Sequence, residues 1–158
     1  MRHALIHKKA ELIDRFIDVY KRERKRNTFP HKEVKSLIHL LFQGSSYSGR
    51  GAFKTVHKVS SRARDLVLKT ARRNAIRNDQ IAYKRLPSRI RNRYFAKVYW
   101  RTKYCLLQKY GKEANVPKEK LEQLKIANEY GLKDIRPANV RKVDGIFKIV
   151  DASLTDRK

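Results

Sequence analysis

An aspartate and an asparagine lie five residues apart in a segment whose side chains suit phosphate chemistry. They are Asp134 and Asn139, in the run from Leu132 to Val140, and Pro137 stiffens the backbone between them. The Asp134 carboxylate can orient a hydroxyl group and accept its proton, while the amide oxygen of Asn139 can ligate magnesium. Arg136 can neutralise a phosphoryl group during its transfer. The alternative interpretation is a capped turn that contains Asp and Asn by chance.

A second carboxylate lies twelve residues after Asn139, at the end of an apolar strand-like run. This residue is Asp151, which follows the segment from Phe147 to Val150. Magnesium prefers hard oxygen ligands, and Asp151 with Asn139, water and phosphate oxygens would satisfy it without a dedicated protein cage. Taken alone, Asp151 is equally consistent with a polar residue that ends a strand.

Two features upstream could bind phosphate groups. Gly49 and Gly51 fall at a strand-to-strand turn, where backbone N–H groups can approach phosphates without obstruction from a Cβ atom. Thirteen residues after Val56, Lys69 lies inside an apolar strand, where an ammonium group is costly unless it meets an anion such as a nucleotide phosphate. The alternatives are an ordinary glycine turn and a lysine on the solvent face of an edge strand.

These features follow one another in the order of the phosphate loop, lysine, catalytic loop and metal site of protein kinases. The chain from about 43 to 154 resembles the protein-kinase-like superfamily, particularly its compact microbial and viral members. The resemblance implies a nucleotide-binding, serine/threonine-kinase-like phosphotransferase with ATP and Mg²⁺ as cofactors. It implies catalytic roles for Lys69, Asp134, Arg136 and Asp79, metal binding by Asn139 and Asp151, and cofactor binding by Gly49, Gly51, Val56, Lys69, Gln108 and Tyr110.

Two of these roles depend on position within the resemblance. The segment from Leu106 to Gly111 corresponds to the hinge between kinase lobes, which would bind adenine through backbone groups near Gln108 and Tyr110. The helix after Lys69 would carry the glutamate that pairs with this lysine, but Asp79 is the nearest substitute there.

The chain also departs from the kinase pattern. The His-Arg before the catalytic aspartate is replaced by Leu132-Lys133, and the Phe-Gly after the metal aspartate is replaced by Ala152-Ser153. Because the sequence ends at Lys158, we expect a truncated second lobe, with a protein partner completing the substrate site. A second hypothesis is therefore a catalytically weak or inactive kinase-like binding module.

The elements expected to position these residues give an α+β fold. Leu5, Leu12, Phe16 and Val19 predict one face of a helix over 5–20, and a second helix follows Pro30. Residues 1–43 are thus predicted to form a helical hairpin. Residues 44–158 are predicted to form a minimal kinase-like domain, with a small antiparallel-sheet lobe at about 44–111 and a truncated helical second lobe at about 112–158.

Within that domain the residue patterns predict alternating strands and helices. A strand hairpin is expected over 54–60 and 65–70, with its turn at 61–64, and a helix over 71–86 that stops at Pro87. Strands are expected over 94–100 and 104–108, and a helical segment over 117–130. Two last strands, over 140–142 and 147–150, flank the turn at Asp144-Gly145.

The charge is strongly positive and unevenly distributed. The chain has 40 Lys and Arg against 15 Asp and Glu, a formal charge of +25. Residues 1–43 contribute +6, residues 44–111 contribute +16 and residues 112–158 contribute +3. ATP alone does not require such a charge, so we expect a polyanion such as RNA, DNA or a nucleoprotein. The alternatives are a solvated basic face or an acidic protein. The arginines expected to bind it are Arg62, Arg64, Arg72, Arg73, Arg91 and Arg93.

Cysteine content and hydropathy bear on the compartment. Cys105 is the single cysteine, so no intramolecular disulfide can form, which fits a reducing compartment. No run approaches the roughly 20 apolar residues of a membrane span, and the N-terminus lacks an apolar signal core. We therefore expect a soluble cytoplasmic protein that does not bind membranes.

Overall fold

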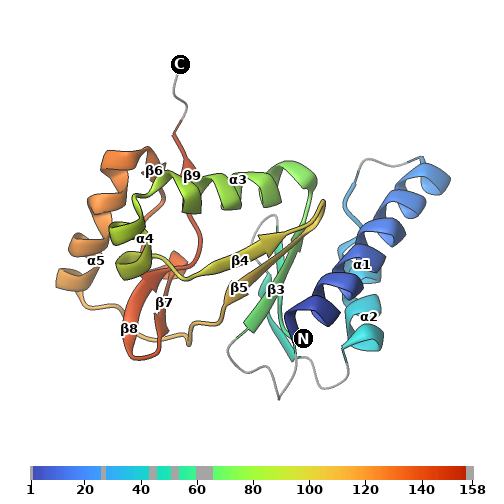
Figure 1. The fold of residues 1–158 in the computed structure, drawn as a ribbon, viewed down its shortest axis with the longest axis horizontal. Helices are drawn as coiled ribbons and strands as arrows, with labels where there is room; N and C mark the ends of the chain where they lie inside the picture. The colour runs from blue at the N-terminus through green and yellow to red at the C-terminus, as the bar shows by residue number, and fades with distance from the viewer. Residues whose placement is uncertain (1, 26–27, 43–45, 51–53, 60–65, 156–158) are drawn as a thin grey trace. The chain divides into compact units, whose positions relative to one another are not determined.

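The computed structural model describes residues 2–25, 28–42, 46–50, 54–59 and 66–155, which fall into two compact units. The first unit comprises residues 1–77 and 100–107, and the second comprises residues 78–99 and 108–158. The chain contains both helices and antiparallel strands, so the α+β class is confirmed (Figure 1).

Helices α1 (Arg2–Arg24) and α2 (His31–Leu41) open the first unit, as the sequence predicts. The predicted buried face of α1 is wrong, because Leu5, Leu12 and Val19 are 56%, 48% and 39% exposed. The buried row lies one position further along the helix. Both rows have helical spacing, so periodicity alone did not distinguish them. The buried row consists of Ile6, Ala10, Ile13 and Ile17.

The side chain of Lys9 joins α1 to the end of α2. Its Nζ donates a hydrogen bond of 2.6 Å to the carbonyl oxygen of Leu41 and lies 5.0 Å from the centre of the Phe42 ring. The last-turn carbonyl of α2 thus has a charged donor. Although α1 has 23 residues, neither it nor any other helix in the described part of the chain is long and apolar enough to cross a membrane.

A five-stranded sheet has the order β1-β2-β3-β5-β4. The expected hairpin of β2 and β3 is confirmed, with Val56 paired to Lys69 in antiparallel register. The strand implied before the Gly49 turn is β1, which includes Gly49 and pairs with β2 through a register irregularity between Tyr47 and Gly49. The turn expected at 61–64 lies outside the described residues. The strands are β1 (Ser46–Arg50), β2 (Lys54–Lys58), β3 (Leu66–Ala71), β4 (Val98–Arg101) and β5 (Cys105–Lys109).

Two aspartates of α1 hold the turn between β4 and β5. Asp14 accepts hydrogen bonds from the Thr102 hydroxyl at 3.1 Å and from the backbone N–H groups of Lys103 at 3.2 Å and Tyr104 at 2.9 Å. Asp18 accepts the Tyr104 hydroxyl at 2.7 Å and pairs with Lys103 Nζ at 2.9 Å. Burial raises the pKa of Asp14, although these hydrogen bonds act in the opposite direction. The network fixes α1 to the sheet within the first unit.

Helix α3 (Arg73–Arg85) ends before Pro87, as predicted, and the short helix α4 (Ser88–Tyr94) follows. The strand expected over 94–100 is therefore wrong in its first part, because the chain is helical to Tyr94 and β4 begins only at Val98. The arginines at every second position of α4 give the alternating pattern of a half-exposed strand. The segment is helical instead, and Arg91 bonds it to the end of α3, a contact that sequence periodicity does not reveal.

From residue 118 onward, the described part of the second unit consists of a helical stretch followed by short strands and a short 3-10 helix. The helical segment predicted over 117–130 is confirmed, but its second half is a 3-10 helix. The β7–β8 hairpin is confirmed, with positive φ angles of 48° at Asp144 and 83° at Gly145 that suit its two-residue turn. Strands β6 and β9 were not predicted. The elements are α5 (Lys118–Leu124), η1 (Lys125–Tyr130), β6 (Leu132–Lys133), η2 (Pro137–Asn139), β7 (Val140–Val143), β8 (Ile146–Ile149) and β9 (Ser153–Leu154).

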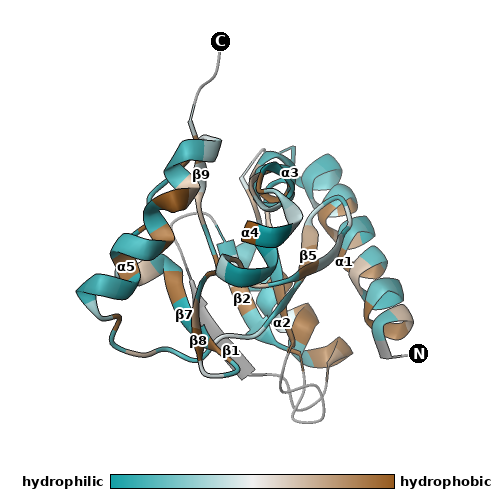
Figure 2. Cartoon of the chain, turned by 60° about the vertical axis from the view of Figure 1, so that its left-hand side comes forward, coloured by the Kyte–Doolittle hydropathy of each residue, from teal (hydrophilic) through white to brown (hydrophobic). Residues whose placement is uncertain are grey.

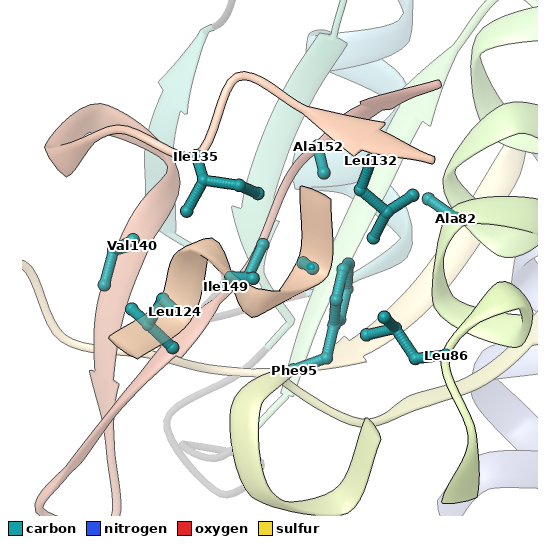
Figure 3. Close-up of a cluster of buried hydrophobic side chains, with 10 residues drawn as sticks. Ala82, Leu86, Phe95, Leu124, Leu132, Ile135, Val140, Ile149 and Ala152 are labelled. Atoms are coloured by element: carbon teal, nitrogen blue, oxygen red, sulfur yellow. The ribbon is translucent and has the colours of Figure 1, made fainter. Parts of the chain in front are cut away.

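The core of the second unit gathers buried residues from almost all of its elements (Figure 3). Phe95 and Leu86 pack in it beside Leu124 and Ile149, and Tyr83 meets the Phe95 ring edge-on at 5.5 Å. Leu132, Ile135 and Ala152 also belong to it. The core therefore extends beneath the segments that carry Asp134 and Asp151, and burial of these apolar neighbours fixes both segments.

Candidate functional site

Asp134 lies directly after β6, in a conformation that few residues other than glycine adopt. Its φ is 64°, in the left-handed region, where Asp and Asn are tolerated better than most residues. The side chain is exposed, while its neighbours Leu132 and Ile135 are buried in the core. The apolar neighbours thus hold the backbone, and the carboxylate remains accessible to a substrate.

The side chain of Asn139 spans the same loop. Its Nδ2 donates a hydrogen bond of 2.8 Å to the carbonyl oxygen of Asp134, and its backbone N–H donates to Arg136 O at 2.9 Å. An amide group has one donor end and one acceptor end, so this bond directs Oδ1 away from the Asp134 carbonyl. Arg136 is exposed at the start of η2. The loop is therefore closed by its own hydrogen bonds, and Oδ1 remains an acceptor.

Two backbone connections bring Asp151 to this loop. The N–H of Val150 donates to the carbonyl oxygen of Asn139 at 2.9 Å. Strands β6 and β9 pair in antiparallel register, with Lys133 opposite Ser153. Both strands are labelled in Figure 1. Asp134 follows β6 directly and Asp151 precedes β9 by two residues. The structure thus places the backbone of Asn139 against Val150, the residue before the half-buried Asp151, and joins the segments of Asp134 and Asp151 through β6 and β9. The metal and catalytic roles expected for these three residues stay predictions.

Lys69 occupies the middle of β3, in the first unit. It is only 5% exposed, and all six residues of β3 are buried. Its strand neighbour Val56 is half-buried on β2. The predicted solvent-facing alternative for Lys69 is therefore excluded. A buried ammonium group is stable only beside negative charge or polar partners, so this position suits contact with an anion.

The glycines of the expected phosphate loop are described in part. Gly49 lies on β1 and pairs with Val56 on β2, at the register irregularity. Gly51 lies outside the described residues. Strand β2, the partner of β1, adjoins β3, the strand of Lys69, in the sheet order.

Gln108 and Tyr110 of the expected adenine-binding segment lie at and just beyond the end of β5, in the second unit. Gln108 is 1% exposed, and its Nε2 donates to the carbonyl oxygen of Ala96 at 3.3 Å. No described residue donates a hydrogen bond to its buried Oε1. Tyr110 is half-buried. The Gln108 side chain is therefore internal, so a ligand at this residue would meet its backbone and not its side chain.

The chain just after this segment approaches β7 very closely. Lys112 and Lys142 exchange two backbone hydrogen bonds of 2.8 Å. A Cβ atom at Gly111 would overlap the Cβ of Arg141 and lie 3.0 Å from Val143 Cγ2. Glycine is therefore required at this position by space.

Asp79 is buried on α3, at 7% exposure, and belongs to the second unit together with Asp134, Asn139 and Asp151. Lys69 belongs to the first unit. The predicted pairing of Asp79 with Lys69 stays a prediction.

The arginines expected to bind nucleic acid have different environments. Arg72 is exposed between β3 and α3, Arg73 is exposed at the first position of α3, and Arg93 is exposed on α4. Arg62 and Arg64 lie outside the described residues. Arg91 is half-buried: its Nε donates to Tyr83 O at 3.0 Å and its Nη2 to Lys84 O at 3.1 Å and Leu86 O at 2.9 Å. Its guanidinium caps the C-terminal carbonyls of α3, a structural role that the sequence did not reveal.

A hollow that the sequence did not indicate adjoins the Asp134 loop. Its volume is about 870 Å³, and Pro137 and Ala138 of η2 form one side. Arg141 also lines the hollow, and its Nη1 donates a hydrogen bond of 2.9 Å to the carbonyl oxygen of Ala138. These residues meet only in the tertiary structure, and no sequence motif relates them. The remaining lining residues are Glu113, Ala114, Asn115 and Val116.

Within the described ranges, no group of three or more His, Cys, Asp and Glu side chains could hold a metal ion. A magnesium site at Asn139 and Asp151 would combine one carboxylate with one amide oxygen, and such a pair is not a group of three His, Cys, Asp or Glu side chains.

In comparisons with known proteins, no protein-family model matches the sequence and no curated protein is detectably similar to it.

Proposed function

We propose that this protein is an ATP- and magnesium-dependent phosphotransferase of the protein-kinase-like type. The observation that carries the proposal is the pair of hydrogen bonds through which Asn139 connects the Asp134 loop to the segment that carries Asp151. Asn139 bonds to the Asp134 carbonyl through its side chain and to the residue before Asp151 through its backbone. The loop that carries Asp134 and Asn139 is thus bonded to the segment that carries Asp151, and this arrangement suits phosphoryl transfer.

Lys69 supports the proposal independently. Protein kinases carry the lysine that contacts the nucleotide phosphates on the third strand of the sheet, after a glycine-rich turn. Here Lys69 is buried on β3 and follows the β1–β2 hairpin that contains Gly49. The strand, its place in the chain and its burial all fit a lysine that binds phosphate.

The available oxygen atoms fit magnesium. Since Nδ2 of Asn139 is bonded to the Asp134 carbonyl, Oδ1 is the end left to face a cation. Asp151 provides a half-buried carboxylate in the segment whose backbone bonds to Asn139. Bound magnesium would neutralise the negative charge that develops on the phosphate oxygens during transfer. Hard oxygen donors with room for water are the ligands that this ion prefers.

Asp134 would act on the acceptor. Its exposed carboxylate would hydrogen-bond the acceptor hydroxyl and take its proton as the new oxygen–phosphorus bond forms and the bond to the nucleoside diphosphate breaks. The exposed Arg136, two residues later, would contribute positive charge close to the transferred group. Deprotonation and charge stabilisation would then come from one short loop.

The departures from the kinase pattern have structural explanations. Leu132 and Ala152, which replace residues of the family motifs, are both buried in the core of the second unit. Ser153 pairs with Lys133 in the β6–β9 ladder. These positions therefore stabilise the loops, and regulation through a movable aromatic residue after Asp151 is not part of the proposal.

The test compares three variants that each replace one carboxylate by its amide. Asp134→Asn and Asp151→Asn alter the proposed site, whereas Asp144→Asn alters the exposed β7–β8 turn, where Asp144 only faces Lys109 at 3.5 Å. Each purified protein is incubated with γ-labelled ATP and magnesium, alone and with RNA, DNA or protein acceptors. We expect label transfer by the wild type and Asp144→Asn, and a loss of at least 100-fold, on the order of a general-base effect, in the other two.

The alternative function is a kinase-like binding module that retains nucleotide without transferring phosphate. It is favoured by the replacement of a helix glutamate by Asp79 and by Ala152-Ser153 after the metal aspartate. Magnesium-dependent ATP binding that Asp151→Asn abolishes, with no transfer to any acceptor, would support the module. Absence of both binding and transfer in the wild type would overturn both functions.

A further inference from the structure

We propose that a basic surface around helix α4 binds the phosphodiester backbone of nucleic acid. The surface, called the α4 surface here, lies entirely within the second unit and is distinct from the Asp134 loop. The proposal does not depend on phosphotransferase activity. The α4 surface consists of Lys84, Arg89, Arg93, Lys97 and Lys148.

Hydrogen bonds to the backbone of α3 and α4 bring these cations together. Arg91, between Arg89 and Arg93, donates to the carbonyl oxygen of Lys84, so the end of α3 lies against α4. Lys148 Nζ donates to the carbonyl oxygen of Asn92 at 2.8 Å, which places its charge beside Arg93. Residues from two helices and a strand therefore contribute to one surface.

Lys97 is fixed next to the same elements by the strand that follows α4. The Ala96 N–H donates to Ile149 O at 2.8 Å, and Phe95 forms a parallel bridge with Ile149. Lys97 therefore directly follows the stretch of chain that bonds to β8, the strand of Lys148. Arg89 and Arg93 are four residues apart on α4 and occupy the same exposed face.

No acidic side chain of this segment reaches the surface to neutralise these charges. Residues 80–112 contain no Asp or Glu, and the nearest carboxylate before them, Asp79, is buried. In the described part of the chain, none of the five cations forms an ion pair with a carboxylate. Like charges held close together repel each other, and this repulsion is relieved when a polyanion binds.

Aromatic rings support two of the cations. The Arg93 guanidinium lies 5.3 Å from the centre of the Tyr94 ring, and Lys97 Nζ lies 5.0 Å from the centre of the Tyr99 ring. Both rings are half-buried, so they restrict the charged side chains lying over them. Such restriction lowers the conformational entropy that the cations lose on binding.

The composition of the α4 surface favours nucleic acid as the occupant. The large apolar side chains that are exposed in the described part of the chain lie on α1, α2 and β8, and none lies on α3 or α4. A membrane-binding surface would need such apolar side chains, whereas protein–nucleic acid interfaces are polar and positively charged. In Figure 2, α4 is mostly hydrophilic on the side that faces the viewer.

The experiment uses two triple variants of equal charge. Arg89→Ala/Arg93→Ala/Lys97→Ala removes three charges from the α4 surface. Lys112→Ala/Lys118→Ala/Lys120→Ala removes three exposed charges from another surface, interspersed with Glu113 and Glu119. Binding to fluorescein-labelled 20-nucleotide single-stranded RNA, single-stranded DNA and duplex DNA is measured by anisotropy between 50 and 300 mM salt, without ATP. Circular dichroism checks that each protein is folded.

We expect the α4-surface variant to lose at least tenfold in affinity at low salt, while the matched control loses less than threefold. Because each phosphate contact contributes a slope of about 0.9 for duplexes and 0.7 for single strands, the salt dependence should fall by about 2 to 3 only in the α4-surface variant. The RNA and DNA arms identify the preferred polymer.

Equal losses in both triple variants would show that net charge, and not the α4 surface, governs binding, and would overturn the proposal. So would wild-type binding to poly-glutamate or phosphatidylserine vesicles with no binding to nucleic acid. The Asp134→Asn variant should bind nucleic acid like the wild type. The two proposals therefore fail or succeed separately.

Discussion

The side-chain amide of Asn139 donates a hydrogen bond of 2.8 Å to the backbone carbonyl of Asp134, five residues earlier. The bond fixes the orientation of the amide and therefore leaves Oδ1 available for a cation. Since Val150 N–H bonds to the carbonyl of Asn139, the same residue also connects the loop to Asp151. The side chain and backbone of Asn139 thus join the two halves of the candidate metal site.

Replacing Asn139 should weaken nucleotide binding only when magnesium is present. Asn139→Ala removes Oδ1 and the bond to Asp134, and the expected loss is roughly tenfold or more in magnesium-dependent affinity. The measurement is titration of a fluorescent ATP analogue with magnesium or with EDTA. Asn128→Ala, at an exposed position of η1, is the control. An equal loss with and without magnesium would argue against a metal-binding role for Asn139.

Substitutions at Asp134 should distinguish the cost of its backbone conformation from the loss of its carboxylate. With φ at 64°, Asp134→Ala should be about 1–2 kcal/mol less stable than Asp134→Asn, because alanine tolerates this conformation poorly. Both variants should lose phosphate transfer. Asp144→Ala, at φ 48°, should lose stability similarly but retain transfer. Urea unfolding and the transfer assay together provide the comparison, and equal stability of the two Asp134 variants would contradict it.

Gly111→Ala should destabilise the protein by about 1–3 kcal/mol because the new methyl group overlaps Arg141. The cause is tested by repeating the substitution in an Arg141→Gly background, where the overlapping Cβ atom is absent. Urea unfolding should then show a smaller cost for Gly111→Ala. Simple additivity of the two substitutions would indicate another cause.

His57 should make folding sensitive to mild acid. Burial, together with His39 and Lys35 nearby, lowers its pKa from 6.5 to about 4. The unfolded chain therefore binds more protons between these values, and stability falls as the pH drops from about 6.5 toward 4. His57→Leu should flatten this part of the profile of unfolding free energy against pH. An unchanged slope in His57→Leu would refute the assignment.

Replacing Arg91 should lower the free energy of unfolding, whereas replacing Arg93, two residues later, should hardly change it. Arg91→Ala removes three hydrogen bonds to the carbonyls at the end of α3, and the expected cost is about 2 kcal/mol or more. Arg93→Ala, at an exposed position, should cost less than about 0.5 kcal/mol. Chemical unfolding of both variants provides the measurement. Similar small costs would mean that the Arg91 bonds are not important for α4.

Local signals in the sequence predicted several elements correctly. The β7–β8 hairpin follows from Asp144-Gly145, since few residue pairs adopt its two positive φ angles. The end of α3 follows from Pro87. The buried face of α1 could not be chosen, because the row at Leu5 and the row at Ile6 have equivalent spacing. Only packing against the rest of the unit distinguishes them.

Elements that depend on distant partners were missed. Strands β6 and β9 have two residues each and exist because Leu132 pairs with Leu154 across a long stretch of chain. Helix α4 depends on the contacts of Arg91 with the end of α3. Short segments have little intrinsic preference, so long-range hydrogen bonds and burial determine their conformation.

The sequence by itself determined which groups are present for phosphate chemistry and in what order, because residue types and spacing are properties of the chain. It also determined the excess of positive charge. The tertiary structure decided that Asn139 bonds to Asp134 and to the residue before Asp151, that Lys69 is buried, and that Arg91 bonds to α3 while Arg89 and Arg93 stay exposed. The physical reason is that these outcomes depend on hydrogen bonds and burial between residues that only folding brings together.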